Sequence, residues 1–122
     1  MKINFKLFFI LVGLTVIFSS CRTSAPRLDY QALARASVLL GIDINLEDDH
    51  KLYLEAADWI GAPYRGGGDS KRGTDCSGMV YQIYRKVYRI QVPRNTEELK
   101  NKSNKVAKRN LKEGDLVFFS SN

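Results

Sequence analysis

Histidine and cysteine are scarce in this chain of 122 residues, which contains one histidine and two cysteines. Zinc sites in proteins are built from closely spaced sets of these residues. His50 is distant in sequence from both Cys21 and Cys76, so no metal site is expected.

Long hydrophobic segments are also missing. The longest uncharged apolar run, residues 7–18, covers 12 residues, whereas a membrane-spanning helix needs about 20. The run follows two lysines within residues 1–6 and precedes Ser19 and Ser20. This order of basic, apolar and small residues is typical of a bacterial export signal, so we expect residues 1–20 to be a removable signal peptide.

The end of this segment, Phe-Ser-Ser-Cys at residues 18–21, resembles the lipobox of bacterial lipoproteins. The resemblance implies that Cys21 is lipidated and becomes the first mature residue, and more than one acyl chain gives stable membrane anchoring. Arg22, in place of an aspartate, favours the outer membrane. The alternative is a disulfide between Cys21 and Cys76, which an oxidising compartment allows.

Stacking aromatic residues are missing from the basic stretch 100–112. Nucleic-acid partners are therefore not expected, and a solvated surface explains this stretch better. Removal of residues 1–20 leaves 17 basic and 13 acidic residues, a formal charge of +4. A basic protein outside the cytoplasm suits anionic partners such as the cell wall and lipid head groups.

The spacing of apolar residues predicts three helices. The first is expected to end at Gly41, because glycine commonly follows the last helical residue. The second is expected to begin at Asp48 or Asp49, because aspartate is a good helix cap. The predicted ranges are 28–40, 49–60 and 76–87.

The remaining segments are less regular. We predict a glycine-rich loop over residues 61–74, a polar segment over 95–110, and a turn leading into a short apolar strand within 111–119. One strand cannot pair its own backbone groups, so either a partner or further chain must complete the sheet. Residues 21–48 are interpreted as a lipidated tether with a helix, and 49–122 as the N-terminal part of a domain.

Cys76 lies where the glycine-rich loop meets the third predicted helix, in the run Gly-Thr-Asp-Cys-Ser-Gly. The partial positive charge of a helix N-terminus favours a thiolate, which indicates a nucleophile. A small buried side chain or half of a disulfide are the alternatives. The sole histidine, His50, lies among acidic residues at a helix start and is interpreted as a solvated end residue rather than a catalytic base.

Four short motifs within residues 52–119 resemble, in order and spacing, those of the NlpC-type family of cell-wall cysteine peptidases. Residues 59–68, Trp-Ile-Gly-Ala-Pro-Tyr-Arg-Gly-Gly-Gly, resemble its glycine-rich loop, and 74–78, Thr-Asp-Cys-Ser-Gly, its nucleophile motif. The Pro-Arg pair 93–94 resembles a third signature. Residues 114–119, Gly-Asp-Leu-Val-Phe-Phe, resemble a strand that enters the family's sheet.

This resemblance implies an α+β, papain-like fold in which N-terminal helices pack on an antiparallel sheet. It implies hydrolysis of peptidoglycan stem peptides, commonly between D-glutamate and a diamino acid, with no cofactor. By position, Cys76 is the expected nucleophile, while Tyr64 and Asp75 are expected to contact substrate. Tyr64 packing the loop and Asp75 capping the helix are the structural alternatives, and for Arg94 we expect a structural ion pair.

The family's base is a histidine on a strand beyond the 114–119 motif, and its polar partner follows on the next strand. Neither occurs here, so the sheet is expected to be incomplete and this chain alone to be inactive or nearly so. A non-catalytic wall-binding lipoprotein is the main alternative, and an amidase or acyltransferase a further one.

Overall fold

Helix caps explain where the first three helices begin in the computed structural model, which describes residues 27–120. Asp29 caps α2 (Tyr30–Leu40), Asp49 caps α3 (His50–Ala57), and Asp75 caps α4 (Cys76–Ile83). In each case a carboxylate oxygen accepts an amide N–H of the first turn, which otherwise has no partner in the helix. The predictions for residues 1–20 and Cys21 lie outside the described residues.

All three predicted helices are confirmed, with shorter ends. α2 stops at Gly41, which adopts a left-handed conformation, and Asp49 is the cap of α3, as predicted. The third predicted helix is α4 followed by a π-helical turn, Tyr84–Tyr88, so its axis continues to about the expected end.

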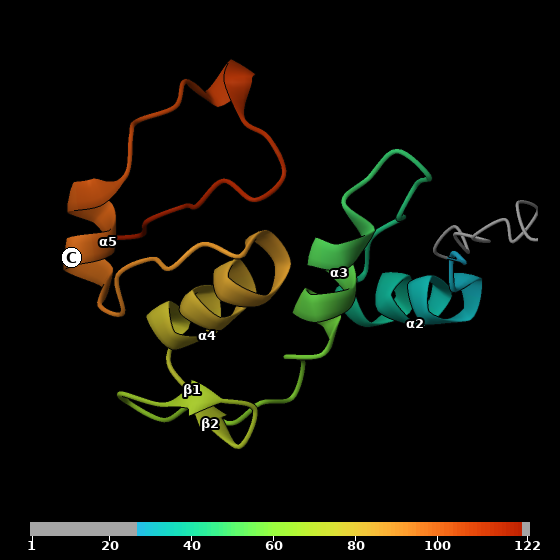
Figure 1. Ribbon diagram of the computed structural model, residues 1–122, viewed down its shortest axis with the longest axis horizontal. Helices are drawn as coiled ribbons and strands as arrows, with labels where there is room; N and C mark the ends of the chain where they lie inside the picture. Colours follow the sequence, from blue (N-terminus) through green and yellow to red (C-terminus); the bar gives the residue numbers. More distant parts are fainter. Residues whose placement is uncertain (1–26, 121–122) are drawn as a thin grey trace, which may run out of the picture.

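The helices form a row in which each contacts the next, in the order α2, α3, α4 and then α5 (Thr96–Lys102) (Figure 1). Apolar residues from all parts of the row are buried between them: Leu33, Ala36, Ala57, Trp59, Ile83 and Leu99. This small core fixes α4, and therefore the residue at its start, against its neighbours.

A buried carboxylate, Glu55 of α3, lies beside this core. It accepts a hydrogen bond of 3.2 Å from the indole N–H of Trp59 and forms an ion pair with Lys86. A buried charge is tolerated only when it is paired in this way. Glu55 therefore joins α3 to the π-helical turn that extends α4.

The sheet within residues 27–120 is a hairpin of two short antiparallel strands, β1 (Asp69–Ser70) and β2 (Gly73–Thr74). Asp69 pairs with Thr74, and β1 packs against α4. Helices with a small antiparallel sheet agree with the expected α+β class, while the papain-like arrangement stays a prediction. No helix of this part of the chain has the length and apolar character to cross a bilayer.

The apolar strand predicted near the end of the chain is wrong for the described residues. The preceding turn is present, because the Lys112 amide donates to the Asp115 carboxylate at 2.8 Å. Residues 116–119, however, pair with no strand in the described part, and the Phe119 side chain is 91% exposed. A strand forms only where a neighbour accepts its backbone hydrogen bonds, whatever its apolar pattern.

Glu113 attaches this turn to α3. Its carboxylate accepts from the amide of Asp49 at 2.8 Å and from the hydroxyl of Tyr53 at 2.6 Å. The same carboxylate raises the pKa of Tyr53 to about 12, chiefly through that hydrogen bond, because phenolate would lose the donor. Glu113 thus fixes the turn against α3, although the residues after the turn pair with no strand in the described part of the chain.

The segment predicted to be merely polar, residues 95–110, contains α5 and a 3₁₀ turn, Lys108–Asn110. Asn95 caps α5 by accepting the Glu98 amide at 2.7 Å, and its side-chain amide donates back to the Glu98 carboxylate at 3.2 Å. Leu99 is the buried anchor of α5. The prediction missed this helix, which places Thr96 at its first position.

Candidate active site

The structure places Cys76 at the first position of α4, on the surface. Its thiol forms no disulfide within the described residues, and Sγ lies 3.9 Å from Oγ1 of Thr96. The amides of the first helical turn point along the axis at this end, where the helix dipole favours negative charge. An oxyanion formed beside Cys76 during a reaction would be stabilised here.

Backbone pairing brings the glycine-rich loop to this helix start. Thr74, two residues before Cys76, donates its amide to the carbonyl of Pro63 at 3.0 Å and accepts from the amide of Arg65 at 2.9 Å. Tyr64 lies between these two bonds, in a parallel bridge with Thr74, and its side chain is 83% exposed. Its predicted contact with substrate stays a prediction, and its exposure leaves the hydroxyl open to solvent.

Asp75 has both carboxylate oxygens engaged. Oδ1 accepts from the amide of Gly78 and from Nη1 of Arg94, at 2.8 and 2.9 Å, while Oδ2 accepts from the amide of Gly67 at 2.8 Å. These bonds hold the loop onto the helix start. Asp75 therefore supports the site, and direct contact with substrate stays a prediction that must compete with these partners.

Arg94 completes this junction from a third segment. Besides the ion pair with Asp75, it donates to the carbonyl of Gly68 at 2.5 Å and to the hydroxyl of Ser77 at 3.0 Å. The expectation that Arg94 is held by a carboxylate is confirmed. A guanidinium suits this place because its planar donors reach several acceptors at once.

Gly78 lets the three segments approach closely. A Cβ atom there would overlap the carbonyl oxygen of Gly68 and lie 2.6 Å from Nη2 of Arg94. The position is inside α4, where glycine is otherwise unfavourable, so the requirement is the close approach and not the helix.

The junction predicts a loss of stability in acid. The pKa of Asp75 is lowered from its ordinary value of 3.8 to about 2. The hydrogen bond from Arg94 contributes most to this shift, and the hydrogen bond from the Gly78 amide contributes next. A lowered pKa stabilises the fold above the unfolded value, and this stability is lost as pH falls through the folded value. We expect the free energy of unfolding to drop by about 1 to 2 kcal/mol from pH 5 to pH 2, allowing for partial solvent screening.

Asp75→Asn should remove most of this pH dependence in urea unfolding. Asp29→Asn is the matched control, because Asp29 caps α2 by bonding backbone amides without an arginine. Equal acid loss in native protein and Asp75→Asn would contradict the assignment.

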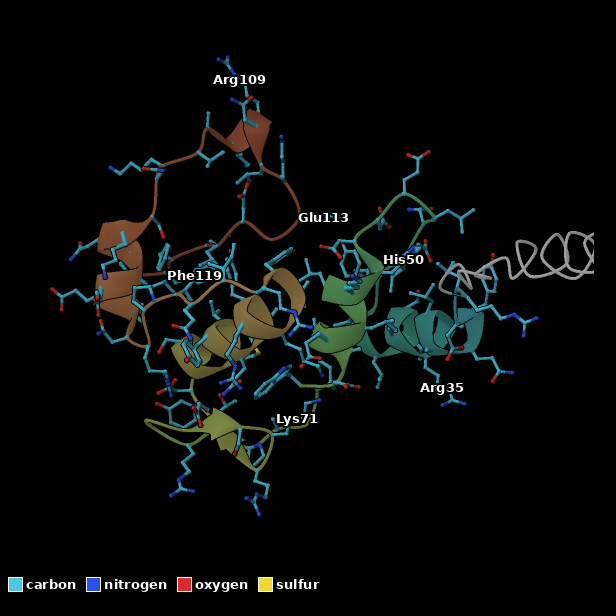
Figure 2. All side chains as sticks on the ribbon, viewed as in Figure 1. Arg35, His50, Lys71, Arg109, Glu113 and Phe119 are labelled. Carbon is cyan, nitrogen blue, oxygen red and sulfur yellow. The ribbon has the colours of Figure 1, made fainter. Side chains whose placement is uncertain are left out.

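The single histidine does not belong to this junction. His50 lies at the start of α3 (Figure 2), and its Nε2 is 2.7 Å from the carbonyl oxygen of Asn45 in the preceding turn. The interpretation of His50 as a helix-end residue agrees with this placement. Among residues 27–120, no group of three or more potential metal ligands comes together.

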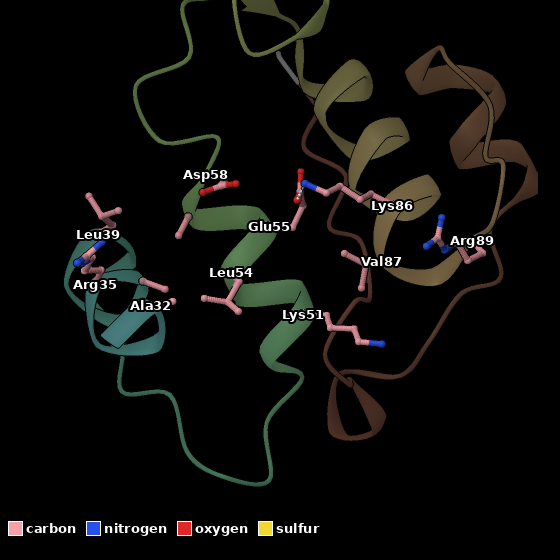
Figure 3. A pocket seen from close by; sticks show the side chains of 12 residues that line it. Ala32, Arg35, Leu39, Lys51, Leu54, Glu55, Asp58, Lys86, Val87 and Arg89 are labelled. Carbon is pink, nitrogen blue, oxygen red and sulfur yellow. Dashed lines mark ion pairs between the residues drawn. The ribbon is translucent and has the colours of Figure 1, made fainter. Parts of the chain in front are cut away.

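Two clefts among residues 27–120 lie beside other elements. Figure 3 shows a groove of about 610 Å³ between α2, α3 and the π-helical turn, with the Glu55–Lys86 ion pair across it. A cleft of about 1050 Å³ lies between α5 and the segment that includes residues 115–118. Neither is lined by Cys76 or Tyr64, and Cys76 lies exposed at the start of α4.

Thr96 lies at this site and was not among the residues predicted for it. Its approach to Cys76 depends on the cap of α5, and the pair Asn95 and Glu98, three residues apart, was the available signal. Reading that pair as a cap would have placed Thr96 at a helix start.

Comparison with known proteins supplies a family. The sequence profile of the NlpC/P60 family matches residues 61–122. A protein of Haemophilus influenzae, the probable endopeptidase NlpC homolog, is 31% identical over an alignment covering 96% of this chain and 76% of that protein.

Two further relatives match shorter stretches. The murein DD-endopeptidase MepS/murein LD-carboxypeptidase of Escherichia coli is 39% identical over 62% of this chain and 40% of its own length. The gamma-DL-glutamyl hydrolase of Bacillus subtilis is 41% identical over 60% of this chain and 18% of its own length. The matched region thus spans less than half of either relative.

Proposed function

The chain belongs to the NlpC/P60 family, and from this premise we propose that it serves peptidoglycan hydrolysis with Cys76 as the nucleophile. The observation that carries the proposal is the exposed thiol at the first position of α4, beside the anchored loop that presents Tyr64. The names of the relatives, two endopeptidases and a glutamyl hydrolase, support a peptide substrate of the wall.

The proposed reaction begins with attack of the Cys76 thiolate on the carbonyl carbon of a stem-peptide amide. The carbonyl oxygen takes the negative charge near the first amides of α4. The C–N bond then breaks, the amine leaves with a proton, and water hydrolyses the thioester to a carboxylic acid and the free thiol. No cofactor enters this sequence.

The step that this chain does not supply is the proton transfer. An acid–base group must take the thiol proton and protonate the leaving amine. The only histidine, His50, has its Nε2 at Asn45. We therefore propose that the 122-residue chain by itself is a very slow hydrolase.

The bond proposed for cleavage joins D-glutamate to the diamino acid. The Bacillus subtilis relative is named for glutamyl hydrolysis, whereas the Escherichia coli relative is named for DD-endopeptidase and LD-carboxypeptidase activities. The two names point to different bonds. An open site with an exposed Tyr64 is compatible with an extended peptide, and product identity decides between the bonds.

The test is mass spectrometry of defined muropeptides incubated with the chain in imidazole buffer, with Cys76→Ala as control. We expect products cut after D-glutamate in the native chain alone. Products cut at the DD bond would overturn the proposed bond, and intact muropeptides under all conditions would favour the non-catalytic wall-binding lipoprotein.

We further propose that lipid on Cys21 anchors the protein in a membrane, with the outer membrane favoured by Arg22. The lipobox-like run 18–21 supports this. When the chain is expressed in a Gram-negative host fed radiolabelled palmitate, label should be absent from Cys21→Ala and present in Cys76→Ala. Label retained in Cys21→Ala would contradict the anchor.

A further inference from the structure

We propose that Thr96 is a positioning residue for the Cys76 thiol, with its hydroxyl donating a hydrogen bond to the thiolate. The proposal rests on the proposed function of Cys76 as nucleophile. Sγ and Oγ1 are 3.9 Å apart, within hydrogen-bond range for the large sulfur atom, and either group can be the donor. Once the sulfur is ionised, only the hydroxyl can donate.

The place of Thr96 is fixed on both sides. Before it, Arg94 is bonded to Asp75 and to the carbonyl of Gly68, which ties this segment to the start of α4. Immediately before Thr96, Asn95 caps α5 through the amide of Glu98. The hydroxyl therefore reaches Cys76 from a backbone held by two independent sets of bonds, as a positioning residue requires.

The hydroxyl is available for this purpose. Its contact with Cys76 is the one hydrogen bond formed by the Thr96 side chain within the described residues. The charged groups at the two helix starts are the Asp75–Arg94 ion pair, Glu97, and Glu98 paired with Lys102 at 2.7 Å. A neutral donor adds stabilisation of the thiolate without changing any of these charges.

The experiment measures alkylation of Cys76 by iodoacetamide from pH 6 to pH 9 in the 122-residue chain. Thr96→Val removes the hydroxyl and keeps the side-chain shape, whereas Thr96→Ser keeps the hydroxyl. For a hydrogen bond of ordinary strength to the thiolate, we expect Thr96→Val to slow alkylation roughly three- to tenfold at pH 7. The midpoint of the alkylation rate against pH should move to higher pH. Ser should react as the native chain does.

Thr96→Ala provides a second hydroxyl-free variant in case Val perturbs the start of α5, and circular dichroism checks each fold. Cys21→Ala is the common background, so that only one thiol reacts. Equal alkylation rates and midpoints in the three Thr96 variants and the native chain would overturn the proposal. Equal slowing in Thr96→Ser and Thr96→Val would overturn it as well.

Alkylation needs no muropeptide, so this result is separate from the test of hydrolysis. Slower alkylation in Thr96→Val together with no hydrolysis would contradict the proposed function alone. Hydrolysis together with equal alkylation rates in native chain and Thr96→Val would contradict the positioning role alone.

Discussion

Imidazole should accelerate muropeptide hydrolysis by the 122-residue chain by up to about 100-fold over the same pH without imidazole, the lower end of what a positioned acid–base group contributes, because free imidazole is not held in place. The expectation follows from the proposed role of Cys76 as nucleophile and from the described residues, among which no histidine is bonded to the thiol. Cys76 is exposed, so a small base can reach the sulfur, and His50 is engaged at Asn45. The rate is measured by chromatography of products across an imidazole series at constant ionic strength.

Two variants make this result specific. Cys76→Ala should show no response to imidazole, because the added base has no thiol to activate. His50→Ala should respond as the native chain does, since His50 is at the start of α3 and not at the helix that carries Cys76. A response that survives in Cys76→Ala, or a large basal rate that disappears in His50→Ala, would contradict the assignment of roles.

Local signals predicted the parts of the fold that local bonds create. Asp49 begins α3 and Gly41 ends α2 because a cap or a left-handed residue acts within one turn of itself. Cys76 was placed at a helix start because a glycine-rich loop gives way there to a helical apolar pattern, and in the structure Asp75, one residue earlier, caps α4. These positions could be inferred without any knowledge of tertiary contacts.

Long-range bonds account for what the sequence could not supply. Asp75 and Arg94 are 19 positions apart, and nothing in either local sequence specifies that they meet. The segment that brings Thr96 to Cys76 is held by that pair on one side and by the Asn95 cap of α5 on the other. Residues 116–119 show the opposite case, in which an apolar pattern favours a strand but no neighbouring strand is present within the described residues.

The same long-range junction underlies the largest expected effect on stability. Gly78→Ala should lower the free energy of unfolding by about 1 to 3 kcal/mol, the usual range for overpacking against groups that cannot move away easily. The added Cβ would meet the carbonyl oxygen of Gly68 and the guanidinium of Arg94. The carbonyl belongs to the backbone, so it cannot turn away as the end of a side chain can. Alanine in an unobstructed helix position would instead stabilise the protein by about 1 kcal/mol.

The sign of the change therefore tests the close approach of loop and helix. Gly66→Ala is the matched control, since its Cβ would meet only the Tyr64 hydroxyl, at 4.0 Å, and we expect a change within about 0.5 kcal/mol. Urea unfolding of both variants supplies the free energies.

Gly78 adjoins the bonds that fix Asp75 and Arg94, so Gly78→Ala should also displace the start of α4. We therefore expect the rate of alkylation of Cys76 to change in Gly78→Ala. A stabilised Gly78→Ala would mean that the loop does not lie against α4, and the anchored arrangement of Tyr64, Asp75 and Cys76 would have to be abandoned.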